Sequence, residues 1–130
     1  MTDAVLAGIG RTSARLLVVG GAATLRVPGA GGMTVQQDPE FPASLRAIAA
    51  ACADQHAAFL ATGPGVDWTY LSPAAQVTPG RRTGNYRLGT DELVTDEDGN
   101  SAISMEDLAV ALLNEAETPK HRRSRFTVGY

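Results

Sequence analysis

The sequence contains almost no cysteine. Cys52 is the only cysteine among 130 residues, which excludes an internal disulfide and a cysteine-based zinc cluster. A reducing cytoplasm is the simplest setting for a chain of this kind. The length suits one domain over residues 1–130, large enough for a real core but small for a complete dinucleotide-binding fold.

Long apolar runs and a strong charge of either sign are also missing. No stretch approaches the length that spans a bilayer, and Met1–Gly8 lacks the basic start and apolar core of an export signal. The net charge of −3 gives no attraction toward nucleic acid or an anionic membrane. The locally basic Lys120–Arg125 follows a helical pattern, so solvated capping of that helix explains it. We expect a soluble, cytoplasmic protein with neither partner.

The glycine clusters do not form a nucleotide-binding motif. Gly8-Ile9-Gly10 has Ser13 at the place of the third glycine and precedes a strand instead of following one. Gly29-Ala30-Gly31 has Thr34 at that place. Neither cluster therefore meets the strand, glycine turn and helix context that a phosphate-binding loop requires.

Neither of the two candidate metal sites has enough suitable ligands. Cys52 and His56 lie one helical turn apart, but two ligands do not make a zinc site, and packing explains them better. The acidic turn Asp96–Asn100 would place Val94 and Met105 at ligand positions of a calcium loop, so it is a solvated turn.

Two apolar runs have the pattern of buried parallel strands. Trp68–Leu71 is β-branched, aromatic or apolar, with no polar alternation, and Ser72-Pro73 ends it. Leu16–Val19 is a second such run, and its closing Gly20-Gly21 allows close backbone approach. Ligands of open α/β sheets bind beyond the carboxyl ends of the strands. The pattern therefore predicts a ligand site at Gly20-Gly21 and Ser72–Ala74.

The helical segments follow from caps and periodicity. Asp38–Pro42 should open a long helix capped by Asp38 or Ser44, with a core-facing stripe from Leu45 to Phe59. The other expected elements are a short helix over residues 4–9 capped by Asp3, a hairpin turn at Asp98–Asn100, a helix from the N-cap Ser104 to Pro119, and a final strand over residues 126–130.

Six segments resemble, in order, the C-terminal part of atypical short-chain dehydrogenase/reductases. The bacterial NAD(P)H-binding proteins related to biliverdin reductase B and flavin reductases are the most similar group. The segments are residues 16–22, 39–42, 67–74, 79–89, 103–107 and 125–128. The match extends over nearly the whole chain, and six ordered motifs are more specific than any one of them.

The resemblance implies an α/β fold: a partial Rossmann-like parallel sheet with flanking helices and a small β-hairpin, whose N-terminal dinucleotide-binding half is absent. The implied cofactor is NAD(P)H. Gly20, Gly21 and Ala22 would line its nicotinamide from one strand, and Leu71, Ser72, Pro73 and Ala74 from the next. Thr24 could donate a hydrogen bond to a substrate, although an ordinary loop hydroxyl explains it better.

The resemblance leaves the activity open. The active-site tyrosine-x-x-x-lysine of typical members has no counterpart, since Phe41 and Leu45 stand at that spacing. Atypical members also lack it and rely on the hydride chemistry of the cofactor. We expect an oxidoreductase-like protein. The isolated chain should bind NAD(P)H weakly or not at all. The alternative is a non-catalytic interaction protein that completes its sheet, as a homo-oligomer or with a partner chain, through the edge of Leu16–Val19.

Overall fold

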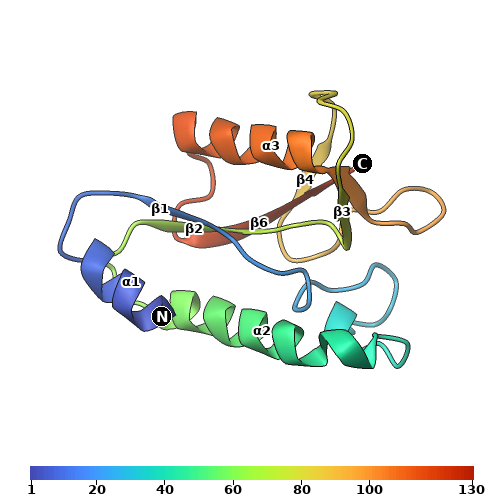
Figure 1. Ribbon diagram of the computed structural model, residues 1–130, viewed down its shortest axis with the longest axis horizontal. Coiled ribbons are helices and arrows are strands. Elements are labelled where there is room, and N and C mark those ends of the chain that lie inside the picture. The colour runs from blue at the N-terminus through green and yellow to red at the C-terminus, as the bar shows by residue number, and fades with distance from the viewer.

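The computed structural model describes residues 1–130 and has three layers (Figure 1). A four-stranded sheet forms the middle layer. Helices α1 (Thr2–Ile9) and α2 (Arg46–Ala61) cover one face, and α3 (Met105–Glu117) covers the other. This arrangement confirms the expected α/β class.

Three parallel strands and one antiparallel strand make up the sheet, in the order β1-β2-β6-β4. Leu16 lies opposite Trp68, and Thr69 lies opposite Ser124. A separate parallel pair, β3 with β5, lies near the start of α3. The bounds are β1 (Leu16–Val19), β2 (Trp68–Ser72), β3 (Gln76–Thr78), β4 (Arg87–Gly89), β5 (Ala102–Ser104) and β6 (Ser124–Gly129), with 3-10 turns η1 (Val35–Gln37) and η2 (Ala43–Leu45).

Strand β2 is the centre of the molecule, because every one of its residues is buried. Its side chains alternate between two apolar clusters, as the two faces of a strand require. The cluster on the α1 and α2 face comprises Leu6, Phe59, Val66, Trp68 and Tyr70. The cluster on the α3 face comprises Leu71, Ala74, Ile103, Ala111, Phe126 and Val128. The expectation of a core strand covered on both faces is confirmed.

Strand β1 forms one edge of the sheet and pairs with β2 alone. It runs parallel to β2 as expected, but it is less buried than its apolar sequence predicts. Leu16, Leu17 and Val18 are half-buried, and Val19 is 48% exposed. The reason is the open side of the strand, with which no further strand pairs.

The predicted start of α2 is wrong. The helix begins at Arg46, its N-cap is Leu45, and no side chain caps it. The Asp38 carboxylate instead accepts a hydrogen bond from the Glu40 amide, and Ser44 lies within the 3-10 turn η2. A short acidic side chain can form such a local turn in place of a helix cap, and the sequence does not show which it will form.

The core-facing stripe of α2 is shorter than predicted. Ala49, His56 and Phe59 are buried, but Leu45 is exposed and Ile48 is 63% exposed. The first turn of α2 therefore extends beyond the sheet, and the packed stripe begins at Ala49.

The other helix ends are partly as expected. Helix α1 begins at Thr2 with Met1 as N-cap, so Asp3 lies in its first turn and caps nothing. Helix α3 confirms its prediction: the Ser104 hydroxyl accepts a hydrogen bond from the Asp107 amide at 3.0 Å, and the helix ends at Glu117.

The predicted β-hairpin does not form. The turn itself is present, because Asp96 accepts hydrogen bonds from the amides of Asp98 and Asn100. The strands on either side, β4 and β5, belong to different sheets. Strand β4 pairs instead with β6, where Leu88 lies opposite Val128. The turn is stabilised by its own side chains and needs no flanking strand pair.

No helix of the chain combines the length and the apolar character needed to cross a membrane.

Candidate functional site

The carboxyl ends of β1 and β2 meet, as the sequence predicts for neighbouring parallel strands. Val19 lies opposite Leu71, and the Gly20 amide donates a hydrogen bond to the Leu71 carbonyl at 2.9 Å. The segments that follow, 20–22 and 73–74, therefore leave the sheet from neighbouring strands. The structure brings the predicted cofactor-lining residues together at one edge.

A tyrosine occupies the space above the two glycines. A Cβ at Gly20 would overlap the Tyr70 ring, and a Cβ at Gly21 would lie 2.9 Å from the Cβ of Cys52 on α2. The Gly21 amide donates to the Tyr70 hydroxyl at 3.4 Å. That hydroxyl has the Cys52 carbonyl at 3.3 Å as an acceptor for its own proton. The glycines thus allow α2 to approach the strand end, and burial raises the pKa of Tyr70.

The predicted site residues differ in accessibility. Leu71, Ser72 and Ala74 are buried, and Leu71 and Ala74 belong to the apolar cluster under α3. Pro73 and the segment 20–22 are partly exposed. A ligand at this edge would therefore first contact Pro73 and the glycine segment.

Two buried hydroxyls at this end of the sheet have no hydrogen-bond partner. Ser72 lies opposite Thr127 on β6, and both are fully buried with their hydroxyl oxygens unpaired. Most buried polar groups in folded proteins are paired. The Ser72 hydroxyl is therefore an unpaired donor and acceptor at the carboxyl end of β2, enclosed by the protein.

Arg125 is a functional candidate that the sequence does not reveal. The basic segment 120–125 was expected to be a solvated cap, but the Arg125 side chain is only 7% exposed. Its guanidinium donates to the Thr24 hydroxyl at 2.6 Å and forms a 2.8 Å ion pair with Asp91. The Thr24 oxygen thus already accepts one hydrogen bond, and its proton and second lone pair remain for a substrate. The detectable signal was the alternation along the final strand, in which Arg125 and Thr127 share a face.

Cys52 and His56 pack against the same tyrosine. The His56 ring centroid lies 4.9 Å from that of Tyr70, and Cys52 faces Gly21. Burial and the nearby Arg125 lower the pKa of His56. The pair therefore contributes a neutral imidazole and a packed thiol to the α2 face.

A second charged cluster lies at the opposite end of the sheet. The Glu115 carboxylate accepts hydrogen bonds from the Arg15 guanidinium at 2.6 Å, from the His121 amide at 2.8 Å and from the Lys120 amide at 3.0 Å. Burial opposes ionisation, but these bonds and the His121 ring lower the pKa of Glu115 to about 2. The cluster joins α3 to the start of β6, which is a structural role.

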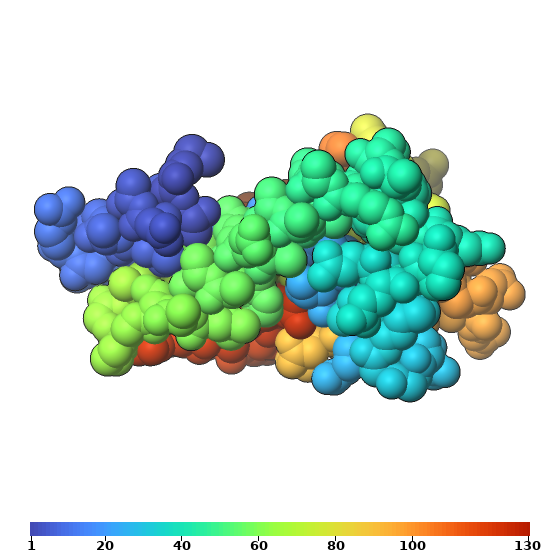
Figure 2. All heavy atoms as spheres, turned by 90° about the horizontal axis from the view of Figure 1, so that it is seen from below, coloured from blue at the N-terminus to red at the C-terminus, as the bar shows by residue number.

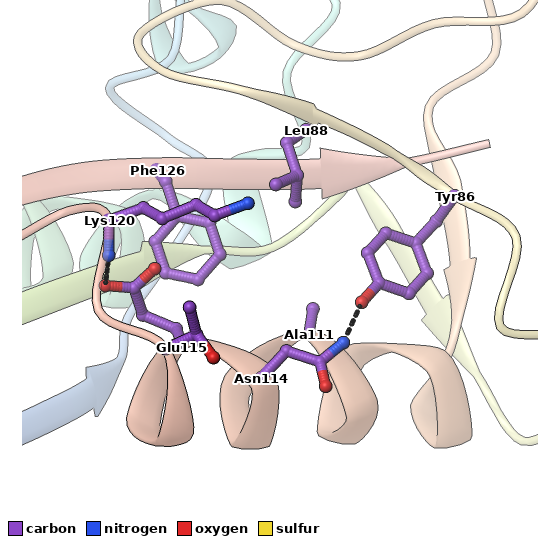
Figure 3. A pocket seen from close by; sticks show the side chains of 8 residues that line it. Tyr86, Leu88, Ala111, Asn114, Glu115, Lys120 and Phe126 are labelled. Atoms are coloured by element: carbon purple, nitrogen blue, oxygen red, sulfur yellow. Dashed lines mark hydrogen bonds between the residues drawn. The ribbon is translucent and has the colours of Figure 1, made fainter.

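A pocket of about 340 Å³ lies on the α3 face (Figure 3). The Asn114 amide donates to the Tyr86 hydroxyl at 2.9 Å on one side, and Lys120 extends across the Phe126 ring on the other. Half of its lining residues are apolar. It is separated by the sheet from His56 and Arg125, and its one carboxylate, Glu115, is already engaged by Arg15 and by the amides of Lys120 and His121.

The residues at the ends of β1 and β2 are compatible in kind with the nicotinamide of the implied cofactor. Pro73, the glycine segment and the unpaired Ser72 hydroxyl could face a nicotinamide and its amide. No glycine turn within residues 1–130 leads directly from a strand into a helix N-terminus: 24 residues separate Gly21 from Arg46. The described residues therefore offer no counterpart to the loop that holds a pyrophosphate.

No family model matches the sequence. A curated relative, protein YwnB of Bacillus subtilis, has no characterised function and is 42% identical over 115 residues, which are 88% of this chain and 54% of YwnB. The chain thus spans about half the length of this relative.

Three solved structures share the fold and much of the sequence. A Burkholderia pseudomallei protein, provisionally described as exported, is 38% identical with a TM-score of 0.90 over 99% of this chain and 62% of its own. A provisional epimerase of Bacteroides thetaiotaomicron is 43% identical with a TM-score of 0.83 over 89% and 53%. A provisional NADH-flavin reductase of Streptococcus pneumoniae is 32% identical with a TM-score of 0.88 over 98% and 61%.

A more distant structure shares the fold alone. A short-chain dehydrogenase/reductase of Veillonella parvula, in complex with NADP, is 13% identical with a TM-score of 0.66 over 99% of this chain and 57% of its own. The comparisons together show that the chain is related to Rossmann-like reductase and epimerase proteins and confirm the partial Rossmann-like sheet.

Proposed function

We propose that this chain is an NAD(P)H-binding oxidoreductase-like protein of the atypical short-chain reductase kind. The observation that carries the proposal is the paired carboxyl ends of β1 and β2, in a chain 32% identical to a protein described as an NADH-flavin reductase. Gly20, Gly21 and Ala22 would lie on one side of the nicotinamide, and the segment 71–74 on the other. The cofactor would supply the hydride chemistry, while these residues orient its ring.

Binding by the isolated chain should be weak or absent. A Rossmann protein holds its dinucleotide mainly by the pyrophosphate, at a glycine turn and a helix N-terminus. Residues 1–130 offer only the nicotinamide side of such a site, so turnover should be negligible.

The test is an amide NMR titration of the chain with NADH and with NADPH at physiological salt. We expect dissociation constants of millimolar order or weaker, with shift changes concentrated in segments 20–22 and 71–74. A low-micromolar constant would contradict weak binding. Shift changes confined to the Tyr86 and Asn114 pocket would contradict the site.

The Ser72→Ala variant tests whether the nicotinamide lies against the end of β2. The substitution removes a buried hydroxyl that has no partner, so the thermal midpoint should be unchanged or slightly higher. Cofactor-induced shifts should weaken if Ser72 contacts the nicotinamide amide. The matched control is Thr127→Val, which removes the neighbouring unpaired hydroxyl on β6. Equal losses in both variants would contradict a site between β1 and β2.

A second candidate function, sheet completion with another chain, rests on β1. This strand has a free edge, half-buried leucines and a 48% exposed Val19. Unpaired backbone groups along an apolar strand are a template for another strand. We propose assembly through this edge, as a homo-oligomer or with a partner chain.

A further inference from the structure

A polar cleft separates the C-terminal half of α2 from the start of β6. In Figure 2, atoms of β6 (red) are visible along the margin of α2 (green), beside the segment near residue 90 (yellow-orange). The cleft has a volume of about 560 Å³, within the range of small-ligand sites. Its lining residues are His56, Leu60, Thr90, Asp91, His121, Arg123, Ser124 and Arg125, of which only Leu60 is apolar.

The cleft contains one carboxylate, that of Asp91, and two guanidinium groups, those of Arg123 and Arg125. Asp91 is already engaged by Arg125 at 2.8 Å. Arg123 takes part in none of the ion pairs of the chain and makes no side-chain hydrogen bond. The cleft therefore retains one unpaired positive charge.

Other polar groups without partners line the same cleft. The Nε2 atom of His56 is buried and has no hydrogen-bond partner. His121 uses its Nδ1 atom for Glu115, which leaves Nε2 without a partner. The hydroxyls of Thr90 and Ser124 take part in no hydrogen bond of the chain. A buried imidazole nitrogen without a partner costs free energy unless a ligand or water satisfies it.

The backbone conformation of Arg123 is unusual and points to this cleft independently of its lining. Arg123 is the only residue other than glycine with a positive φ, at 53°, and its amide donates to the Trp68 carbonyl at 2.6 Å. Glycine adopts this left-handed conformation without a steric cost, whereas arginine does not. Strain of this kind is concentrated at functional sites. The chain thus places a long cationic side chain at a position whose geometry favours glycine.

We propose that this cleft binds a phosphate group of a small molecule. Arg123 would form the charged contact, since a guanidinium matches two phosphate oxygens at once. His56, His121 and the Ser124 hydroxyl would supply further hydrogen bonds. Arg125, already fixed by Thr24 and Asp91, adds positive potential without contacting the ligand. The site is independent of NAD(P)H binding.

The experiment is a calorimetric titration of the chain with inorganic phosphate at low salt, repeated with Arg123→Gly. That variant removes the charged contact and relieves the left-handed strain, so affinity should fall roughly tenfold or more while the thermal midpoint rises or stays unchanged. Ser124→Ala should weaken binding less. The matched control is Arg122→Ala, because Arg122 pairs with Asp67 and does not line the cleft.

The variants distinguish a phosphate site in the cleft from general attraction to the basic segment. Loss confined to Arg123→Gly and Ser124→Ala supports a phosphate site in the cleft. Equal loss in Arg122→Ala would show general attraction to the basic segment and overturn the proposal. Absence of binding at tens of millimolar phosphate would overturn it as well.

Discussion

Gly20, which directly follows β1, and Tyr70 on β2 lie so close together that the tyrosine ring fills the space where residue 20 would carry a Cβ. The tyrosine reaches from β2 across the end of β1 to the Cys52 carbonyl and the Gln55 side chain on α2. One glycine thus allows a single side chain to connect two strands and a helix.

Gly20→Ala should therefore destabilise the protein by about 1–3 kcal/mol or more, because the ring and the backbone must both move. Chemical denaturation measures the effect. Gly63→Ala is the control, since a Cβ at Gly63 meets nothing within 4 Å. Equal stability of the two variants would show that Tyr70 has another rotamer available.

The Glu115 cluster predicts a specific acid dependence. The pKa of Glu115 is about 2 in the folded protein and 4.5 in the unfolded chain. Its contribution to stability is therefore complete above pH 4.5 and is lost as the pH falls toward 2. Glu115→Gln should lower stability at neutral pH and flatten this part of the profile. Glu117→Gln, on the exposed end of α3, should leave the profile unchanged.

The Tyr130 hydroxyl should contribute to stability through Asp107. It donates to the buried Asp107 carboxylate at 2.6 Å, and Thr83 donates to the same oxygen at 2.5 Å. Tyr130→Phe should lower the thermal midpoint by roughly 5 °C or more, because a bond to an ionised group is lost. Tyr86→Phe removes one exposed bond to Asn114 and should cost less. A smaller loss in Tyr130→Phe than in Tyr86→Phe would contradict this account.

Assembly through β1 is tested by sedimentation equilibrium. Val19 is 48% exposed on this edge strand, so Val19→Lys should weaken self-association with little effect on folding. Leu88→Lys is the matched control, because Leu88 is 49% exposed on the other edge strand, β4. A wild-type monomer at high micromolar concentration, with no partner chain bound, would contradict assembly. Equal dissociation by both variants would place the interface elsewhere.

The sequence predicts the layers of this fold because each depends on local apolar patterns. The apolar runs at Leu16–Val19 and Trp68–Leu71 form strands, and Ser104 caps α3 as its spacing to Asp107 indicates. The formation of each of these elements depends on residues near one another in the chain, so propensity and periodicity suffice.

The remaining features depend on contacts between distant residues. Arg125 is buried because Asp91, 34 residues away, and Thr24, 101 residues away, receive its hydrogen bonds. Asp38 and Ser44 are both acceptable caps, but Asp38 forms a local turn with Glu40 and Ser44 lies in the 3-10 turn before α2, so neither is used. The turn at Asp98–Asn100 has the composition of a hairpin, but tertiary pairing assigns its flanking strands to different sheets.

Helix α3 carries two buried carboxylates, Asp107 and Glu115, on the same side as Ala111. One binds the amides of Thr83 and Gly84, and the other binds those of Lys120 and His121. Opening either loop would leave a charge buried without partners. Solvent exchange of these loop amides should therefore require unfolding of the whole domain, so two irregular segments would be as slow to exchange as the central strand.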